Sequence, residues 1–437
     1  MSRRDVLKAT GATGFVIAAA GCLESEGGDS TPTSGGNDGG SSGGGSSDDS
    51  DNSGGGSAAS KIQFGMVDSL TGSLAPYGER NTRGRELALS AINAEGIGEA
   101  GATLEFLVED DESTSQGGVN AARKLVSQNN VPLLVGSVGS GVSIAIHDAV
   151  ISGSGVTQIS QNSTSPELSN YPDLLRMSPS GAAKGKALAN LVSRDHDTVA
   201  VTWINNDYGT GLSGVFAEEF PGTVAYNNPH DQGQASYRGI LSEMAATDAT
   251  AWVFLTYANE YTIMVNEAFD QGYNEQIQYY GAESTVADSI IENTSPGSMN
   301  GMLGITESAP VDQESYQQFK SDFESKYGST PTVWSAYAYD AITVSAISAE
   351  AAVRADGEVT QEGLANVVRD VTRPEGTKVY SFAEAKAELA GGASATEINY
   401  EGVSGPVDLD ENGDPPGFYQ IYRVEDHEYV FGDFITG

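Results

Sequence analysis

The chain has 437 residues, 60 of them acidic against 22 lysines and arginines, and a formal net charge of -38. This charge repels phosphate backbones and anionic lipid headgroups, which argues against nucleic-acid binding and against a polybasic membrane patch. The single cysteine excludes an intramolecular disulfide, and the four histidines are scattered singly, so we expect no metal site. At about 150 residues per domain, the length allows two or three hydrophobic cores.

The acidic residues are spread along the whole chain. Their mutual repulsion would destabilise a compact state in dilute buffer, but at molar salt the Debye length falls to about 3 Å and the repulsion is screened. We interpret the composition as that of an exported protein of a halophile. An ordinary acidic protein from a low-salt organism is the alternative.

The N-terminal segment carries an export pattern. Arg3 and Arg4 form a twin-arginine motif, followed by an apolar run from Ala12 to Ala20 that is too short to remain as a membrane-spanning helix. The small residues before Cys22 resemble a lipoprotein processing box. We therefore predict that residues 1–22 are a twin-arginine signal with a lipobox and that Cys22 carries a lipid; the alternative is a stray cysteine in a cleaved signal.

Residues 23–60 are dominated by Gly, Ser, Asp and Asn and contain no aromatic residue. Such a composition cannot bury enough apolar surface to offset the entropy of the chain. A flexible tether of this length spans on the order of 35 Å. We expect an exported protein on the outer face of the cell membrane, held there by its lipid anchor.

From residue 61 onward, strand-like runs alternate with amphipathic helical patterns. The predicted strands are 61–66, 103–109, 131–135, 156–160, 199–204, 251–255 and 276–280. The predicted helices are 83–95, 116–128, 183–193, 236–246, 258–271, 313–327, 334–354 and 361–371, and short strands are expected at 406–409, 418–424 and 429–434. This order predicts an α/β fold with parallel sheets, whose ligands bind beyond the carboxyl ends of the strands.

Several stretches in this order resemble one family. They include Gly65-Met66-Val67-Asp68-Ser69-Leu70-Thr71-Gly72, Ala75-Pro76-Tyr77-Gly78, Leu134-Val135-Gly136-Ser137, Ser163-Thr164-Ser165-Pro166-Glu167-Leu168 and Asn206-Asp207-Tyr208-Gly209. The chain is similar to the leucine/isoleucine/valine-binding proteins of ABC importers, in a haloarchaeal-type lipoprotein form. The resemblance implies a type I periplasmic-binding-protein fold, with two doubly wound parallel-sheet lobes joined by three hinge crossings. It places one lobe at 61–178 and 306–404 and the other at 179–305 and 405–437.

A free amino acid needs donors for its carboxylate and an acceptor for its ammonium, because both are costly to desolvate unpaired. The loop 136–143 leaves a predicted strand and enters a helix, which presents backbone N–H groups and the hydroxyls of Ser140 and Ser143. The resemblance implies that Ser140, Ser163 and Thr164 contact the ligand carboxylate. On the residues alone, ordinary turn and N-cap serines are the alternative.

Glu283, in the loop after a predicted strand, matches the acidic residue with which the family pairs the ligand ammonium. Surface charge is the alternative in so acidic a chain. Tyr77, Tyr208 and Tyr257 fall at loop positions that would face the cleft, where each ring offers apolar area and each hydroxyl a polar contact. Packing residues are the alternative, above all for Tyr257, whose surrounding stretch departs from the family pattern.

Other motifs are incomplete. The stretch 408–413 fits the first half of a calcium loop, but Tyr419 stands where the second half needs a bidentate Glu. The glycines of 136–141 match a dinucleotide fingerprint only loosely, no P-loop ending follows them, and no convincing nucleophile, histidine and acid set is present. We therefore expect no cofactor and no enzymatic activity.

Together these patterns predict a membrane-anchored solute-binding protein of an ABC importer. It would capture a small amino acid, branched-chain or aliphatic, between two lobes by hinge closure and deliver it to the permease subunits. We expect a monomer. The alternatives left open are the same fold binding short amides or urea, or serving as a sensory receptor; a secreted enzyme and a purely structural surface protein are more distant rivals.

Overall fold

The computed structural model describes residues 60–171 and 173–435. The predicted signal at 1–22, with Cys22, and all of the predicted tether except residue 60 lie outside this part of the chain. Within the described residues no helix combines the length and the apolar character needed to cross a membrane.

The first sheet has five strands in the order β2-β1-β3-β4-β5, all of them parallel. Its strands are β1 (Lys61–Asp68), β2 (Thr103–Asp110), β3 (Leu133–Val135), β4 (Thr157–Ser160) and β5 (Leu174–Arg176). The strand β1, which lies between β2 and β3, carries a nearly continuous buried run, with Phe64, Met66 and Val67 fully inaccessible. Such runs are typical of parallel strands covered on both faces.

The second sheet has seven strands in the order β15-β14-β10-β9-β8-β6-β7. These are β6 (Thr198–Ile204), β7 (Thr223–His230), β8 (Ala251–Leu255), β9 (Gln278–Gly281), β10 (Leu303–Glu307), β14 (Tyr419–Glu425) and β15 (Glu428–Ile435). The strands β6 to β10 run parallel, and the last two join them as an antiparallel hairpin. A small sheet contains β11 (Thr377–Val379), β12 (Ile398–Gly402) and β13 (Gly405–Pro406).

Thirteen α-helices connect the described strands. They are α1 (Ala75–Glu95), α2 (Ser115–Arg123), α3 (Ser140–Ile146), α4 (Gly181–Val192), α5 (Asp207–Glu219), α6 (Arg238–Ala245), α7 (Ala258–Asp270), α8 (Asp288–Asn293), α9 (Glu314–Tyr327), α10 (Val333–Asp356), α11 (Gln361–Leu364), α12 (Val367–Asp370) and α13 (Phe382–Ala390). Short 3-10 or π segments occupy Lys124–Gln128, His147–Ile151, Pro166–Asn170, Tyr273–Glu275, Glu283–Thr285 and Ala395–Glu397.

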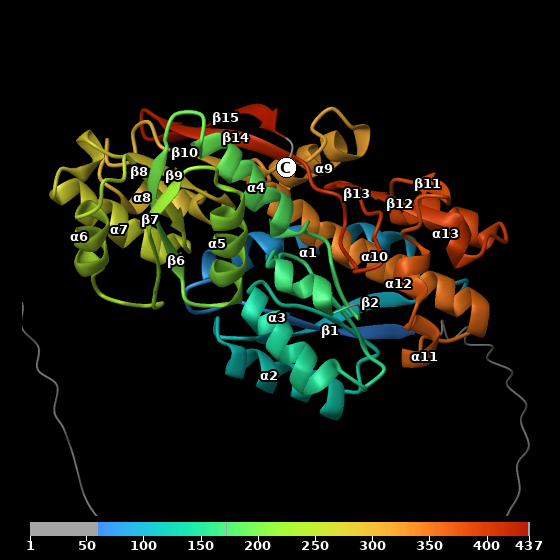
Figure 1. The fold of residues 1–437 in the computed structure, drawn as a ribbon. Coiled ribbons are helices and arrows are strands. Elements are labelled where there is room, and N and C mark those ends of the chain that lie inside the picture. Colours follow the sequence, from blue (N-terminus) through green and yellow to red (C-terminus); the bar gives the residue numbers. More distant parts are fainter. Residues whose placement is uncertain (1–59, 172, 436–437) are drawn as a thin grey trace, which may run out of the picture. The chain divides into compact units, whose positions relative to one another are not determined.

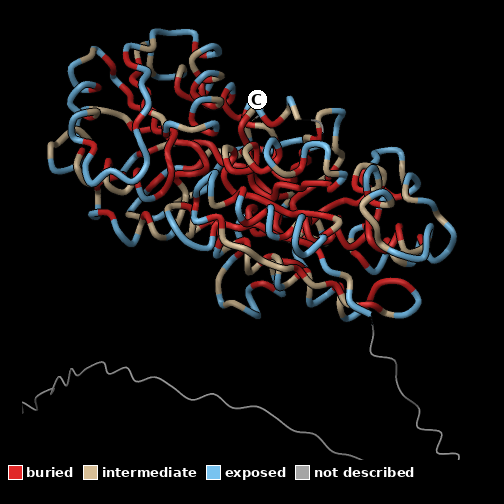
Figure 2. The backbone as a smooth tube through the Cα atoms, turned by 90° about the horizontal axis from the view of Figure 1, so that it is seen from below, coloured by how far each residue is buried: buried red, intermediate tan, exposed pale blue. Residues whose placement is uncertain are grey.

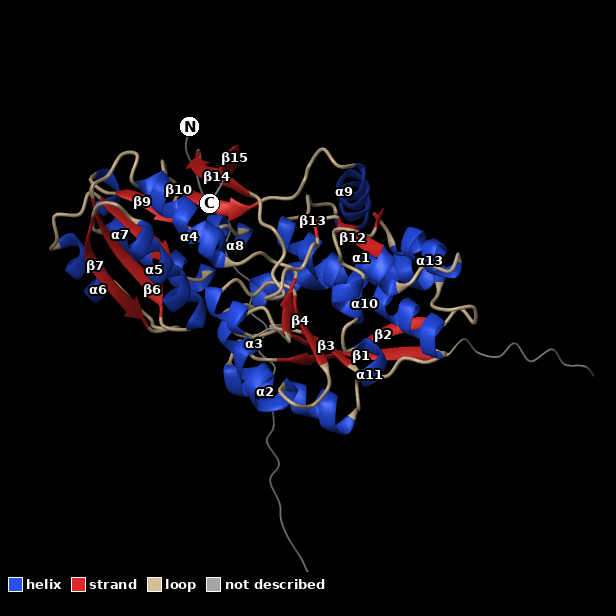
Figure 3. Ribbon diagram, turned by 45° about the vertical axis from the view of Figure 1, so that its right-hand side comes forward, coloured by secondary structure: helices blue, strands red, loops and turns tan. Residues whose placement is uncertain are grey.

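Helices cover both faces of the first sheet, with α2 and α3 on one side and α1 and α10 on the other (Figure 1). We call this sheet and its helices the first lobe. The second lobe consists of the seven-stranded sheet with α4 to α8, in which α4 packs on α5 and α7 on α6 and α8. The chain passes between the lobes three times, before α4, after β10 and before β14, and the two sheets are separate in Figure 3.

Each lobe has its own hydrophobic core (Figure 2). The core of the first lobe is built around α10, most of whose residues are buried and which packs against α1. The core of the second lobe surrounds β8, which is buried along its whole length. Leu74, Tyr77 and Val138 of the first lobe pack against this second core. The lobes are therefore in contact through apolar side chains.

The predicted α/β fold with two parallel-sheet lobes is confirmed. Strand and helix positions agree to within a few residues for most of the predicted elements. The strands β5, β7, β10, β11 and β12 and the helices α5 and α8 were missed, and the helix predicted at 361–371 is split into α11 and α12. β7 lies at the sheet edge, where the polar sequence of Asn227, Asn228 and Pro229 is tolerated and the period-2 pattern is weak. The lobe boundaries at residues 178, 305 and 404 stay predictions.

Candidate functional site

One cavity collects loops from both lobes. Apart from Trp334 on α10, its lining comes from the segments that follow β1, β3 and β4 in the first lobe and β6, β8 and β9 in the second, so it lies beyond the carboxyl ends of the strands. About 40 Å³ of it can hold the centre of a water-sized sphere. The lining residues are Leu74, Tyr77, Arg80, Val138, Gly139, Ser140, Asn162, Thr164, Tyr208, Tyr257, Glu283, Ser284 and Trp334.

The loop after β3 is held in one conformation by contacts of residues that lie outside the cavity. Gly136 has φ 145°, and a Cβ there would lie 2.4 Å from the carbonyl oxygen of Val67, so only glycine fits. The Ser143 hydroxyl accepts from the Ser137 N–H at 2.8 Å and donates to the Ser137 carbonyl at 3.2 Å. Ser143 thus holds the loop and does not line the cavity. Ser140, the first residue of α3, does line it.

The neighbouring turn presents Thr164 to the cavity and keeps Ser163 behind it. The Ser163 hydroxyl lies 2.9 Å from the Ser143 hydroxyl and 3.2 Å from the carbonyl oxygens of Ser137 and Val138. Ser163 is fully buried and is not part of the lining. Its hydroxyl therefore joins the two loops together, and direct contact with a cavity ligand is left to Thr164.

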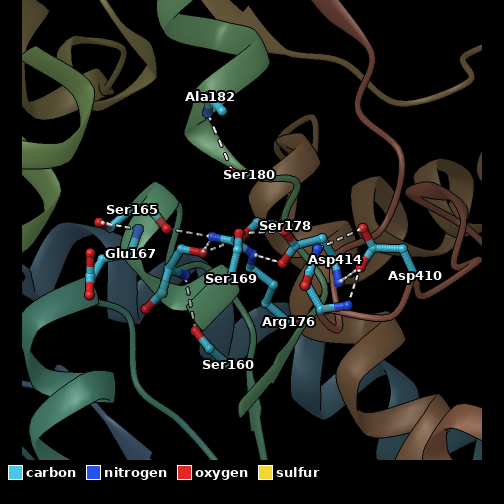
Figure 4. Close-up of polar contacts among 12 residues, drawn as sticks. Ser160, Ser165, Glu167, Ser169, Arg176, Ser178, Ser180, Ala182, Asp410 and Asp414 are labelled. Atoms are coloured by element: carbon cyan, nitrogen blue, oxygen red, sulfur yellow. Dashed lines mark hydrogen bonds and ion pairs between the residues drawn. The ribbon is translucent and has the colours of Figure 1, made fainter. Parts of the chain in front are cut away.

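A buried arginine holds this turn in place through hydrogen bonds (Figure 4). Arg176 donates to the carbonyl of Ser165 at 2.8 Å, to the hydroxyl of Ser169 at 2.9 Å and to a carboxylate oxygen of Asp414 at 2.6 Å. Arg176 ends β5, and its partners come from the turn after β4 and the segment before β14. The arginine thus ties the cavity loop to the third passage between the lobes.

The half calcium motif at 408–413 has a different use in the structure. Asp410 accepts the N–H groups of Asn412 and Asp414 at 2.8 and 3.0 Å, which folds the segment into a tight turn that presents Asp414 to Arg176. Across residues 60–171 and 173–435 no group of three or more potential metal ligands was found. The carboxylate oxygens of Asp410 stabilise this turn.

Three tyrosines line the cavity and are nearly inaccessible. The ring of Tyr257 stacks on Tyr208 at 5.4 Å and meets Tyr77 edge-on at 6.3 Å. Burial raises the pKa of all three above the ordinary value, so they stay neutral. Together they form an aromatic wall for the apolar part of a ligand.

The hydroxyls of these tyrosines differ in availability. Ser284 Oγ donates its proton to the Thr256 carbonyl at 2.7 Å, so Tyr208 must be the donor in its 2.8 Å contact with Ser284. Tyr77 donates to the Ser284 carbonyl at 2.6 Å and accepts from the Ala258 N–H at 3.0 Å. Tyr257 accepts from the Asn206 amide at 3.1 Å, and its own proton has no acceptor among the described residues. Tyr257 is therefore the hydroxyl free to donate to a ligand.

Glu283 lines the cavity and is backed by a buried ionic cluster. The Lys184 ammonium on α4 lies 2.6 Å from Oε2 of Glu283 and 2.9 Å from Oε1 of Glu307 at the end of β10. All three side chains are nearly inaccessible. Oε1 of Glu283 has no hydrogen-bond partner among the described residues and is left to accept from a ligand. We call these three residues the Lys184 triad.

The triad carries one cation between two carboxylates. Burial by itself would lower the pKa of Lys184, but the charges of Glu283 and Glu307 reverse this and raise it above the ordinary value. Burial raises the pKa of Glu307 to about 7, against the opposing effect of Lys184. With both acids ionised the triad keeps one net negative charge, which a ligand ammonium would neutralise.

A second cation lines the cavity from α1. The Arg80 guanidinium lies 4.7 Å from the ring centre of Tyr77 and 5.1 Å from that of Trp334. Burial lowers its pKa to about 10, so it stays protonated at neutral pH. No carboxylate of the described residues lies within ion-pair distance of it.

The structure brings together six of the residues predicted from the sequence as ligand contacts: Tyr77, Ser140, Thr164, Tyr208, Tyr257 and Glu283. The seventh, Ser163, lies one layer behind. Sequence reasoning missed Arg80, Trp334 and both partners of Glu283. For Arg80 a signal was available, because it follows Tyr77 by three residues and shares its helix face; no local pattern marked Lys184 or Glu307.

A periplasmic binding protein family model matches residues 61–428. The Leu/Ile/Val-binding protein BraC3 of Rhizobium johnstonii is 26% identical over 223 residues, 49% of this chain, and the match spans 60% of the relative, less than two thirds of its length. The Leu, Ile, Val, Thr and Ala-binding protein of Pseudomonas aeruginosa is 25% identical over 313 residues, 70% of this chain and 82% of the relative.

Two further similarities cover more of the chain. The chemotactic signal transduction system substrate-binding protein BasB of Halobacterium salinarum is 22% identical over 370 residues, 81% of this chain and 84% of that protein. The crystal structure of the substrate-binding protein LivJ of Streptococcus pneumoniae, solved with isoleucine, superposes with a TM-score of 0.72. It shares 21% identity and covers 86% of this chain and all of its own. At this identity the structural match speaks for the fold alone.

Proposed function

Because the chain belongs to the periplasmic binding protein family, in the type I branch of the branched-chain amino acid receptors, we propose that it captures a free α-amino acid between its two lobes. The proteins of this family bind solutes and are not enzymes. The ligand carboxylate would meet Ser140, Thr164 and the start of α3, and the ammonium would meet Oε1 of Glu283. Tyr77, Tyr208, Tyr257 and Trp334 would surround the remainder.

The observation that supports this proposal most is that one cavity holds donors from one lobe and a carboxyl group from the other. Ser140 and Thr164 belong to the first lobe, and Glu283 to the second. A zwitterion that contacts both lobes stabilises the closed arrangement over an open one, which is the requirement for ligand-driven hinge closure. A neutral amide or urea would leave the net negative charge of the Lys184 triad unbalanced.

Delivery to an ABC permease and anchoring to the outer face of the membrane through Cys22 are further parts of the proposal. They rest on the family resemblance and on the export pattern of residues 1–22. Similarity to a Halobacterium chemotactic substrate-binding protein supports a second readout, in which the closed form signals to a sensory partner. Both readouts use the same ligand site.

Thermal unfolding of the purified protein in molar salt tests the ligand class. An α-amino acid present at 100 times its dissociation constant is expected to add about 2.7 kcal/mol to the free energy of unfolding, a shift of several degrees in the midpoint. Short amides and urea serve as controls and are expected to leave the midpoint unchanged. If only the amides shift it, the cargo is wrong and the receptor function stands; if no solute does, the proposal fails.

Replacing Tyr77 with phenylalanine tests the closure step. The Tyr77 hydroxyl bonds Ser284 and Ala258 across the cleft, so its loss should destabilise the closed arrangement while the ring contacts stay. We expect ligand affinity to fall about tenfold, mainly through faster dissociation. Tyr429→Phe is the matched control, because that hydroxyl donates to Thr285 within the second lobe. Equal effects of both variants would contradict an interlobe role for Tyr77.

A further inference from the structure

Arg80 has an unusual environment for a cation of this chain. It lies on α1 three residues after Tyr77, half-buried, with its guanidinium between the rings of Tyr77 and Trp334. Its Nε is buried and has no hydrogen-bond partner among the described residues. The aromatic contacts fix the plane of the guanidinium but leave its N–H donors unused.

Other arginines nearby are paired with acids. Arg83 contacts Glu79 at 2.5 Å, Arg85 lies 3.8 Å from Asp68, and Arg176 binds Asp414. In a chain with 60 acidic residues, a carboxylate partner for Arg80 would be easy to supply. The acidic residue of the same cavity, Glu283, is engaged by Lys184 instead. The unpaired guanidinium therefore faces space that a ligand would fill.

An aliphatic ligand side chain would make this arrangement costly. Closing the cavity over a hydrocarbon would remove water from the N–H groups of Arg80 and supply no acceptor in return. An oxygen acceptor at the end of the ligand side chain removes that cost. A carboxylate suits it best, because the planar guanidinium fork can donate two parallel hydrogen bonds to the two oxygens.

We propose that Arg80 is a specificity-determining residue that binds a carboxylate at the end of the ligand side chain, so that the preferred cargo is an acidic amino acid. This inference rests on the proposed amino-acid function and narrows it. The α-carboxylate stays with Ser140 and Thr164 and the ammonium with Glu283, while the side chain extends along the aromatic wall to Arg80. A carboxamide side chain offers one acceptor oxygen and would bind more weakly.

The extra negative charge of such a ligand can be balanced by a proton taken up near the cavity. An acidic amino acid adds one net negative charge to a cavity region that already contains Glu283 and Glu307 as well as Lys184 and Arg80. Glu307, whose pKa burial raises to about 7, can take up one proton in compensation. Binding of glutamate or aspartate is therefore expected to be accompanied by proton uptake near neutral pH.

Isothermal titration in molar salt with the full chain tests the inference. The ligands are L-glutamate, L-aspartate, L-glutamine and L-leucine, and the variants are Arg80→Met, Arg80→Lys and Arg83→Met. The wild type should prefer the acidic ligands over leucine. Arg80→Met, whose side chain still fits between the two rings, should weaken glutamate or aspartate binding about 100-fold and leave leucine unchanged or tighter. Arg83→Met, on the same helix but in contact with Glu79 outside the cavity, should have no effect.

The outcomes separate this inference from the proposed function. Preference for leucine in the wild type, unaffected by Arg80→Met, would overturn the inference and leave the amino-acid receptor intact. If Arg80→Met weakens the binding of glutamate and of leucine equally, Arg80 binds the α-carboxylate that both ligands share, and the inference is overturned as well. If none of the amino acids binds, the proposed function itself is wrong. If Arg80→Lys keeps part of the glutamate affinity, the positive charge accounts for that part and the paired hydrogen bonds of the guanidinium account for the rest, which would support the inference.

Discussion

Replacing Glu283 with glutamine is expected to weaken binding of any α-amino acid by about 100-fold, because an ammonium in a closed cavity loses its ionised partner. The variant keeps the size of the side chain, and Lys184 retains Glu307 at 2.9 Å, so the fold should persist. Titration calorimetry or a ligand-induced shift of the unfolding midpoint measures the loss. The expected signature is a change in affinity for zwitterions with little change in the midpoint of the free protein.

The control for this variant is Glu307→Gln. Glu307 contacts the same Lys184 ammonium but does not line the cavity, so its neutralisation removes the same charge from the triad without touching the ligand. Its effect on affinity should be small. If the ligand proves to be an uncharged amide, Glu283→Gln should be nearly harmless. Undiminished binding of an amino acid by Glu283→Gln would show that the ammonium binds elsewhere.

The loops of the site were easier to predict than its charged partners. The family resemblance singled out Ser140, Thr164 and Glu283 as ligand contacts. That the loops carrying them meet at one edge follows from the sequence pattern, because strand ends can be located from apolar runs and the loops after parallel strands share an edge of the sheet. This step needs only the order of the strands and loops along the chain, because each of these residues follows its strand within a few positions.

Lys184 and Glu307 reach the site through contacts that no local pattern records, whereas Arg80 was missed for a local reason. The helix expected to begin at residue 83 begins at Ala75, because Pro76 is favourable in the first turn where its missing N–H costs nothing. A helix that starts at residue 83 leaves Arg80 outside it, so the helix face that Arg80 shares with Tyr77 follows only from the earlier start. Lys184 lay within a predicted helix, but its partners are far along the chain, and Glu307 ends a strand that was missed.

Replacing Lys184 with methionine is expected to destabilise the fold by about 3 to 5 kcal/mol, because two buried carboxyl groups would remain without their cation. Methionine matches the length and apolar stem of lysine, so the loss reports on charge and not on a cavity. Chemical denaturation in molar salt measures it. Lys186→Met on the same helix is the matched control, because Lys186 is exposed, and it should change stability by less than about 0.5 kcal/mol.

The loss caused by Lys184→Met should depend on pH. In the wild type, burial already raises the pKa of Glu307 to about 7, and removal of the cation raises it further. A carboxyl group whose pKa is raised by folding binds a proton more tightly in the native state, so its contribution to stability falls as pH rises from its unfolded value toward its folded one. The variant should therefore approach the wild type at pH 5 and differ most at pH 8. A pH-independent difference would show that Lys184 stabilises the second lobe by packing, and the ionic cluster behind Glu283 would then have no part in holding the ammonium site.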